Sequence, residues 1–400
     1  MDLARGLDTL LYAAVVAALA PVLVALLPGP RIPQVVVLLL GGVLIGPQAL
    51  GWADRASIDL LANVGLGFLF LLAGYELDLH LFRERPGRLA IVAWLVTVAL
   101  AVAMVGVLAA AGLVRAFVPV ALGLTTTAFG TLLPILHDND MLGGRFGRYL
   151  MAAGAVGELF PILAIAVFLG ANNKFVALGS LAAVGVLALV LSFVPRLVRG
   201  DRLERVLLKG EGSTSQTTVR WTVLLMLLLL LVAEDFGLDV VLGAFVAGIV
   251  LRRWSPGDVE ALEGKLDAIG YGFFIPLFFV ASGMALDIRS IAEAPLRLLA
   301  CFLLLLLVRG VPALFLYRRD LPMVRRVQTM LLTATALPLL VALAEIGLRN
   351  GTMLRENAAA LVGAGVLSVL VFPMAAVMIE RRQRAAEPAA AAPEGRPAAE

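Results

Sequence analysis

Apolar stretches alternate with short polar connections along almost the whole chain. About thirteen stretches are candidates for membrane-crossing helices, because about 20 apolar residues are needed to cross the hydrocarbon core of a bilayer. They are residues 8–27, 33–47, 57–76, 88–113, 116–136, 147–169, 175–198, 218–234, 238–252, 267–286, 294–317, 324–346 and 357–380. The second and ninth are short for a crossing. The pattern predicts an all-α polytopic membrane protein, in which residues 1–380 form one transmembrane domain.

The composition agrees with this class of protein. Of the 400 residues, 61% are hydrophobic and 15% are charged, whereas soluble domains are about half apolar and about a quarter charged. The first apolar stretch has no small-residue cleavage site, so we interpret it as a crossing and not as a signal peptide. Residues 381–400 are rich in Ala, Pro and charged residues. We predict that they form a disordered cytoplasmic tail.

The chain lacks the residue patterns of common enzyme and cofactor sites. Its single cysteine, Cys301, lies in an apolar stretch, which excludes a disulfide framework. The two histidines, His80 and His137, are isolated in predicted connections. No Gly-rich phosphate loop, HExxH or GxSxG motif is present. We therefore expect no enzymatic activity, no cofactor, no nucleic-acid partner and no metal apart from a transported cation.

Basic residues are distributed unevenly between the two sides that thirteen crossings define. Of the 32 Lys and Arg residues, 23 fall on one side and 8 on the other, and the remaining one, Arg309, lies in the interior of an apolar stretch. Short connections rich in Lys and Arg stay in the cytoplasm. This asymmetry predicts a cell (inner) membrane protein with its N-terminus outside and its C-terminus in the cytoplasm.

Short motifs recur in the same order in the two halves of the chain. Residues 70–78 (FLLAGYELD) resemble residues 279–287 (FVASGMALD), and residues 125–128 (TTTA) resemble residues 333–336 (TATA). Two further matches join Leu40-Gly41 with Leu242-Gly243, and Phe160-Pro161 with Phe372-Pro373. The matches pair the second apolar stretch with the ninth, and the third, fifth and sixth with the tenth, twelfth and thirteenth.

This pairing separates the two copies by seven crossings, so the second copy begins on the opposite side of the membrane. We therefore predict two inverted six-helix repeats, at about residues 8–169 and 218–380, with a linker helix at residues 175–198. Inverted repeats with interrupted helices are typical of secondary transporters.

Glu158 is an ionisable residue near the middle of the sixth apolar stretch. A charged side chain at the bilayer centre costs about 2.5–3.5 kcal/mol on insertion scales, so such residues are usually functional. Gly154, Ala155 and Gly157 beside it would let another backbone approach closely. We interpret Glu158 as the centre of a polar site. The alternative is a protonated carboxyl group that binds a neighbouring helix.

Threonine clusters lie in the fifth and twelfth stretches, at matching positions of the two repeats. The first contains Thr125, Thr126 and Thr127, and the second contains Thr333 and Thr335. Nearby Gly and Pro residues predict unwound backbone there, whose freed carbonyls must face protein or a cavity. Hydroxyl, carbonyl and carboxylate oxygens suit a small hard cation. Alternatively, the hydroxyls bond to their own helices and only bend them.

Arg309 and Glu76 are two further charges of interest. Arg309 needs a partner within the membrane, and its function is either a counter-charge near Glu158 or a structural contact with a carbonyl. Glu76 ends the third stretch, where it is a cap or a gate charge.

Several motifs resemble those of monovalent cation:proton antiporters of the CPA2 branch, the sodium/hydrogen exchanger group. The most specific are LGAFVAG at residues 242–248 and FFVASGMALD at residues 278–287, and the resemblance covers about residues 8–380. It implies a scaffold part, a core part with two crossed broken helices, and a homodimer. It places the family's acidic pair at Gly157 and Glu158, and the lysine of some electrogenic members near Ser282. Here glycine replaces the first member of the pair, and no base lies near Ser282.

These observations predict a secondary antiporter that exchanges Na+ or K+ for H+ without net charge transfer. Glu158 would bind proton and cation alternately, together with Thr125, Thr126 and Thr127. We expect the site to be lined by Gly157, Ser282, Thr333, Thr335 and Arg309. Three alternatives are a gated potassium-efflux pathway, a sodium-coupled solute transporter of the same fold, and a membrane sensor that transports nothing.

Overall fold

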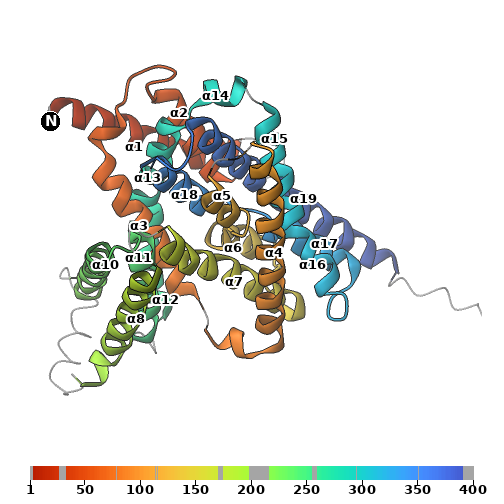
Figure 1. Cartoon of the computed structure of the whole chain (residues 1–400). Helices are drawn as coiled ribbons and strands as arrows, with labels where there is room; N and C mark the ends of the chain where they lie inside the picture. Colours follow the sequence, from red (N-terminus) through yellow and green to blue (C-terminus); the bar gives the residue numbers. More distant parts are fainter. Residues whose placement is uncertain are drawn as a thin grey trace, which may run out of the picture.

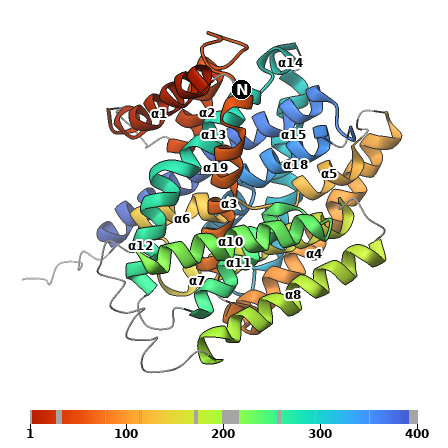
Figure 2. The same cartoon turned by 90° about the vertical axis from the view of Figure 1, so that its left-hand side faces the viewer.

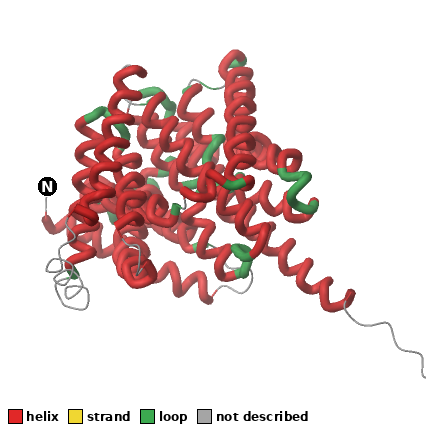
Figure 3. Tube along the Cα trace, turned by 90° about the horizontal axis from the view of Figure 1, so that it is seen from below, coloured by secondary structure: helices red, strands yellow, loops and turns green. Residues whose placement is uncertain are grey.

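The computed structural model describes residues 3–26, 33–77, 79–112, 114, 116–169, 174–197, 216–254, 259–293, 295–349 and 351–390. Within these ranges the regular structure is entirely helical (Figure 3). The α-helices are α1 (Leu3–Leu26), α2 (Gln34–Ile45), α3 (Asp59–Glu76), α4 (Arg85–Ala110), α5 (Phe117–Gly123), α6 (Phe129–Asp138), α7 (Gly144–Phe168), α8 (Lys174–Leu197), α10 (Thr217–Asp235), α11 (Val240–Trp254), α12 (Val259–Ile269), α13 (Ile275–Ala285), α14 (Ile288–Glu293), α15 (Pro295–Leu304), α16 (Val311–Leu316), α17 (Met323–Thr333), α18 (Pro338–Arg349) and α19 (Arg355–Ala390). Short 3₁₀-helices η1 (Arg55–Ser57) and η2 (Leu79–Arg83) precede α3 and α4, and π-helical turns η3 (Gly270–Phe274) and η4 (Leu305–Gly310) join α12 to α13 and α15 to α16.

The thirteen predicted apolar stretches correspond to helices of the structure. Ten helices or helix pairs among the described residues are long and apolar enough to cross a membrane. The shorter α2, the 15-residue α11 and the interrupted pair α5–α6 account for the remaining three stretches. The prediction of an all-α polytopic membrane fold is therefore confirmed.

The helices form two bundles that lie side by side (Figure 1). The scaffold bundle contains α1, α2, α3, α10, α11 and α13, and the core bundle contains α4 to α7 and α15 to α19. The bundles meet where α7 packs on α11 and where α6 packs on α3, while α8 packs on both α7 and α11. Figure 2 shows α8, α10 and α11 together from the scaffold side.

Glycines bring two pairs of scaffold helices into backbone contact. A Cβ atom added to Gly42 of α2 would lie 2.0 Å from the carbonyl oxygen of Val280 in α13. A Cβ atom added to Gly248 of α11 would lie 2.0 Å from the carbonyl oxygen of Leu71 in α3. The predicted repeat relates α2 to α11 and α3 to α13, so the same helix pairing occurs twice.

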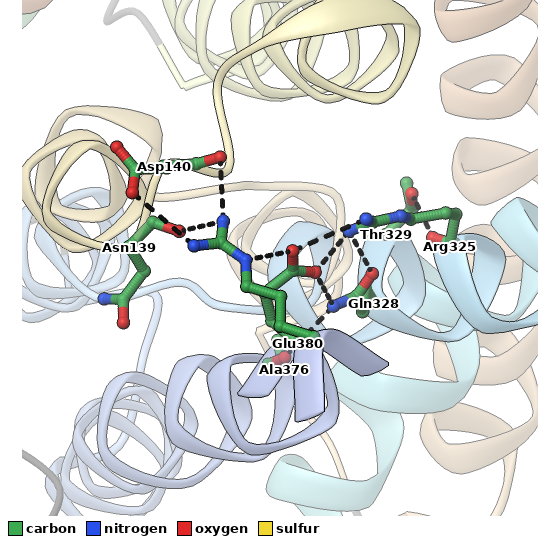
Figure 4. Close-up of polar contacts among 8 residues, drawn as sticks. Asn139, Asp140, Arg325, Gln328, Thr329, Ala376 and Glu380 are labelled. Atoms are coloured by element: carbon green, nitrogen blue, oxygen red, sulfur yellow. Dashed lines mark hydrogen bonds and ion pairs between the residues drawn. The ribbon is translucent and has the colours of Figure 1, made fainter. Parts of the chain in front are cut away.

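The end of the chain differs from the sequence-based prediction. We expected disorder from residue 381, but α19 continues to Ala390, and residues 391–400 lie outside the described part of the chain. Arg384 of this extension donates hydrogen bonds to the backbone oxygens of Asn139 (2.9 Å) and Asp140 (3.3 Å) at the end of α6, and it bonds to Glu380 (3.1 Å) one turn earlier (Figure 4). These tertiary contacts favour helix where composition alone favours disorder.

The connections between helices lie on two faces of the molecule. The arginine-rich face carries η2, the α6–α7 and α16–α17 connections and the end of α19. The opposite face carries η1, the α10–α11 connection, α14 and the end of α18.

Candidate functional site

Two interrupted helices cross in the centre of the core bundle. Helix α5 ends at Gly123 and α6 begins at Phe129, while α17 ends at Thr333 and α18 begins at Pro338. In the gaps, the backbone N–H of Ala128 donates to the carbonyl oxygen of Thr335 at 2.7 Å. The prediction of crossed discontinuous helices is confirmed. This hydrogen bond pairs the N–H of Ala128 with the carbonyl of Thr335, two backbone groups in the helix interruptions that would otherwise lack a partner within the membrane.

Helix α7 holds the first interruption in place. The backbone N–H of Thr127 donates to the carbonyl oxygen of Gly157 at 2.8 Å. The next residue, Glu158, is only 8% exposed, and the backbone N–H of Gly130 interacts favourably with its carboxylate. Gly130 lies in the first turn of α6, where unpaired N–H groups carry partial positive charge. The carboxylate is thus stabilised by a half-helix N-terminus.

Ser368 holds the second interruption, and the sequence analysis did not identify it. This α19 residue is fully buried. Its hydroxyl oxygen accepts the backbone N–H of Ala336 at 3.0 Å and lies 2.8 Å from the carbonyl oxygen of Gly365. A lone hydroxyl in the apolar thirteenth stretch was the available signal. Ser368 therefore acts on the second interruption as the backbone of Gly157 acts on the first.

Most of the threonine hydroxyls bond within their own helices. Thr125 donates to Leu122 O (2.8 Å), Thr126 to Gly123 O (2.9 Å), Thr333 to Thr329 O (2.8 Å) and Thr335 to Leu331 O (3.2 Å). This is the geometry of the bending-only alternative. The hydroxyl oxygens still keep lone pairs that can accept a hydrogen bond or bind a cation.

Thr127 differs from the other threonines because its hydroxyl joins separate elements. Its Oγ1 donates to the carbonyl oxygen of Thr333 at 2.7 Å, across the crossing. The same oxygen accepts a hydrogen bond from Nε of Arg309 at 3.0 Å. Thr127 thereby connects both interrupted helices to the helix that carries Arg309.

Arg309 lies in the π-helical turn η4 and is only 3% exposed. Besides Thr127, it contacts α7, where its Nη2 donates to the carbonyl oxygen of Ala153 at 3.0 Å. None of the ion pairs found in the described part of the chain includes Arg309. Its positive charge is therefore held by neutral oxygen atoms at the crossing. π-Helical turns of this kind often occur at functional sites.

Ser282 and Glu76 both lie in the scaffold bundle. Ser282 lies in α13, which packs on α1, α2 and α3, and its buried hydroxyl has no hydrogen-bond partner. Among the residues that the structure describes, no hydrogen bond joins the Ser282 side chain to the crossing. Glu76, at the end of α3, has a buried and unpartnered Oε2 atom, and it interacts electrostatically with Glu158, Glu263 and Asp267. Glu76 is therefore a buried carboxylate at the end of α3 that interacts electrostatically with Glu158.

Comparison with known proteins agrees with this geometry. Residues 14–379 match the family model described as "Sodium/hydrogen exchanger, transmembrane". A Bacillus subtilis protein named for Na+/H+ antiport is 27% identical over 391 residues, which cover 89% of this chain and 60% of that protein. Cation/H+ antiporter 18 of Arabidopsis thaliana is 30% identical over 315 residues, which cover 71% of this chain and 38% of that protein. The chain thus spans less than two thirds of the length of either relative.

A solved structure shares the fold. The sodium proton antiporter MjNhaP1 from Methanocaldococcus jannaschii at pH 8 superposes with a TM-score of 0.61 and 17% sequence identity, and the match covers 96% of this chain and 98% of that one. The interrupted helices, the buried carboxylate and the family match over residues 14–379 lead to one conclusion. The chain belongs to the transmembrane sodium/hydrogen exchanger family.

Proposed function

We propose that the protein is an antiporter that exchanges Na+ or K+ for H+ across a membrane, and that Glu158 binds the proton and the cation alternately. The observation that carries this proposal is the buried carboxyl group of Glu158, on the residue that follows Gly157, whose carbonyl oxygen accepts the N–H of Thr127 at the crossing. The names of the relatives support antiport by a transporter and not an enzyme. We further propose a homodimer in the cell (inner) membrane, with the N-terminus outside and the C-terminus in the cytoplasm.

Competition for one carboxylate gives the coupling. A carboxylate buried in a medium of low polarity is destabilised when it is charged and unpaired. Either a proton or a bound monovalent cation removes that penalty, but the two cannot occupy the same oxygen atoms together. The core bundle would therefore move across the membrane with Glu158 occupied by one or the other.

The charge of the site supports electroneutral exchange. Arg309 stays protonated throughout, because the guanidinium group does not lose its proton in proteins. The group formed by Glu158 and its ligand is neutral whether that ligand is H+ or a monovalent cation. The core bundle then carries the same charge in both directions, and one proton is exchanged for one cation.

Neutral oxygens at the crossing are the remaining candidate ligands. Thr127 Oγ1 and the carbonyl oxygen of Thr333 lie 2.7 Å apart at the crossing. Hydroxyl and carbonyl oxygens bind hard cations without adding charge. Thr125, Thr126, Thr333 and Thr335 would contribute only through oxygen lone pairs, since their hydroxyl hydrogens are used within their own helices.

A flux assay on proteoliposomes tests the proposal. The purified protein is reconstituted with a pH-sensitive dye inside, and Na+, K+ and Li+ are added in turn. We expect proton movement with at least one cation, and we expect Glu158→Gln to abolish it. Glu234→Gln is the matched control, because Glu234 is an exposed carboxylate at the end of α10. Exchange that persists in Glu158→Gln would show that the site lies elsewhere.

The same assay examines the charge balance and the alternatives. An imposed membrane potential should leave the initial rate of exchange unchanged. A rate that follows the potential would contradict one-for-one exchange. Cation flux without proton movement would favour the potassium-efflux pathway, and flux that requires an organic solute would favour sodium-coupled uptake.

A further inference from the structure

Gly157 and Arg309 compete for one small volume between α7 and Thr127. A Cβ atom added to Gly157 would lie 2.3 Å from Nη2 of Arg309 and 2.5 Å from Oγ1 of Thr127. Non-bonded atoms do not approach so closely, since carbon atoms pack at about 3.5–4.0 Å. No side chain larger than hydrogen fits at position 157 while the guanidinium group stays where it is.

Arg309 has little room to move away. Its two hydrogen bonds attach it to Thr127 on one side and to Ala153 on the other. The next residue, Gly310, is pressed against α17, where an added Cβ atom would lie 2.7 Å from the carbonyl oxygen of Met330. The turn that carries Arg309 is therefore clamped between α7 and α17.

The arrangement also sets the position of Thr127. Thr127 is held at two points. Its backbone N–H donates to the carbonyl oxygen of Gly157, and its Oγ1 accepts a hydrogen bond from Nε of Arg309. A planar guanidinium group can donate to Thr127 and Ala153 at the same time, whereas a lysine ammonium is a point charge on a flexible stem. The geometry therefore requires arginine and not merely a positive charge.

We propose that Arg309 is a positioning residue that replaces the missing side chain at position 157. Its guanidinium group fills the space that a side chain at position 157 would occupy, and it fixes Thr127 at the crossing. It also keeps a second acidic or amide ligand out of the site. This inference rests on the proposed function, because it specifies how the cation site is completed when the first position of the pair is glycine.

The steric part is tested by stability, independently of transport. The thermal stabilities of Gly157→Ala, Arg309→Ser and the double variant are compared in detergent. We expect Gly157→Ala to lower the melting temperature and Arg309→Ser in the same chain to recover part of that loss, because neighbouring residues that share space are not additive. Gly179→Ala on α8 is the matched control, since an added Cβ atom there meets nothing within 4 Å. Additive losses would overturn the proposal even if the wild type exchanged ions.

The positioning part is tested by transport. We expect Arg309→Lys and Arg309→Ser to raise the apparent KM for the cation about tenfold, a size typical of losing a hydrogen bond to a charged group. The maximal rate should fall less than the KM rises. Wild-type KM in Arg309→Lys would show that charge alone suffices and would refute the positioning role. A wild type without exchange would instead reject the proposed function, while the stability test would still report on Gly157 and Arg309.

Discussion

Arg55 of the scaffold bundle forms an ion pair with Glu345 of the core bundle. The Nη2 atom of Arg55, in η1, donates to Oε1 of Glu345, near the end of α18, and Nε of Arg55 lies 3.3 Å from Asp59. The pair lies on the opposite face from the arginine-rich connections. Asp239, which interacts electrostatically with Glu345, lines a mostly apolar contact between α7, α11 and α18 together with Ile162, Leu242 and Ile346. The ion pair and this contact keep the two bundles together on that face.

Breaking this ion pair should make the opposite face open more often. We expect Arg55→Ala to increase the labelling rate of Ile162→Cys, in a Cys301→Ser background, by about two- to fivefold, the range that corresponds to a partly exposed ion pair. A membrane-impermeant thiol reagent added from that side measures the rate. Arg55→Lys, which keeps the positive charge beside Asp59 and Glu345, is the control and should keep labelling slow. Unchanged labelling in Arg55→Ala would mean that the apolar contact alone holds the face shut.

A second carboxylate, Asp320, ties together three segments on the arginine-rich face. This buried side chain in the α16–α17 connection binds Arg85 of α4 (2.9 Å), Arg145 of α7 (3.2 Å) and the hydroxyl of Tyr149 (2.8 Å). Burial alone would raise the pKa of Asp320, but the hydrogen bonds from Arg85 and Tyr149 outweigh it and lower the pKa below its usual value.

The lowered pKa of Asp320 predicts a pH-dependent stability. The contribution is present above the unfolded pKa of about 4 and is lost as the pH falls through the lower folded pKa. We expect Asp320→Asn to cost about 1 kcal/mol at pH 7, a small value because solvent screens the exposed arginines. Thermal unfolding in detergent at pH 7 and near pH 3 measures it. Asp140→Asn, whose side chain is 85% exposed, serves as the control. A gap between wild type and Asp320→Asn that widens in acid would contradict this account.

Sequence patterns were sufficient for the architecture because bilayer thickness and backbone hydrogen bonding leave few solutions. The run Thr125–Thr127 and the residue Pro338 indicated where α5–α6 and α17–α18 would be interrupted, and both breaks occur there. Glu158 was likewise recognisable, because it is an ionisable residue in the middle of an apolar stretch. These features depend on local sequence and on the solvent, not on the details of packing.

The sequence did not predict which residues far apart in the chain contact each other. The contact of Arg309 with Thr127 joins residues 182 positions apart. It depends on a π-helical turn that no residue pattern predicted. The Asp320 cluster likewise joins residues 235 and 175 positions apart. The sequence also did not predict where the threonine side chains point, since four of the five hydroxyls donate to carbonyl oxygens of their own helices. Only the packed structure distinguishes Thr127 from its neighbours.

The polar cluster around Glu380 predicts how the end of α19 acts on α6. Gln328 Nε2 donates to Glu380 at 3.0 Å, Arg325 also binds Glu380, and Arg384 extends to Asn139 and Asp140 (Figure 4). We expect Arg384→Ala to accelerate hydrogen exchange of amides at residues 136–143 while leaving those of α17 protected. Hydrogen-exchange mass spectrometry measures both segments. Arg382→Ala is the control on the same helix. Equal protection in Arg384→Ala would mean that α6 does not need this contact.

The two adjacent threonines Thr126 and Thr127 provide the sharpest comparison at the crossing. Thr127→Val removes the oxygen that binds both Arg309 and Thr333 O, whereas Thr126→Val removes only a bond to Gly123 O within its own helix. Both changes keep a β-branched side chain of similar volume. We expect Thr127→Val to raise the apparent KM for the cation about tenfold, and Thr126→Val to change it much less. Proteoliposome flux measures both, with protein yield as the folding control. A wild-type KM in Thr127→Val, or an equal rise in both variants, would contradict a special role for the hydroxyl that joins the two interrupted helices.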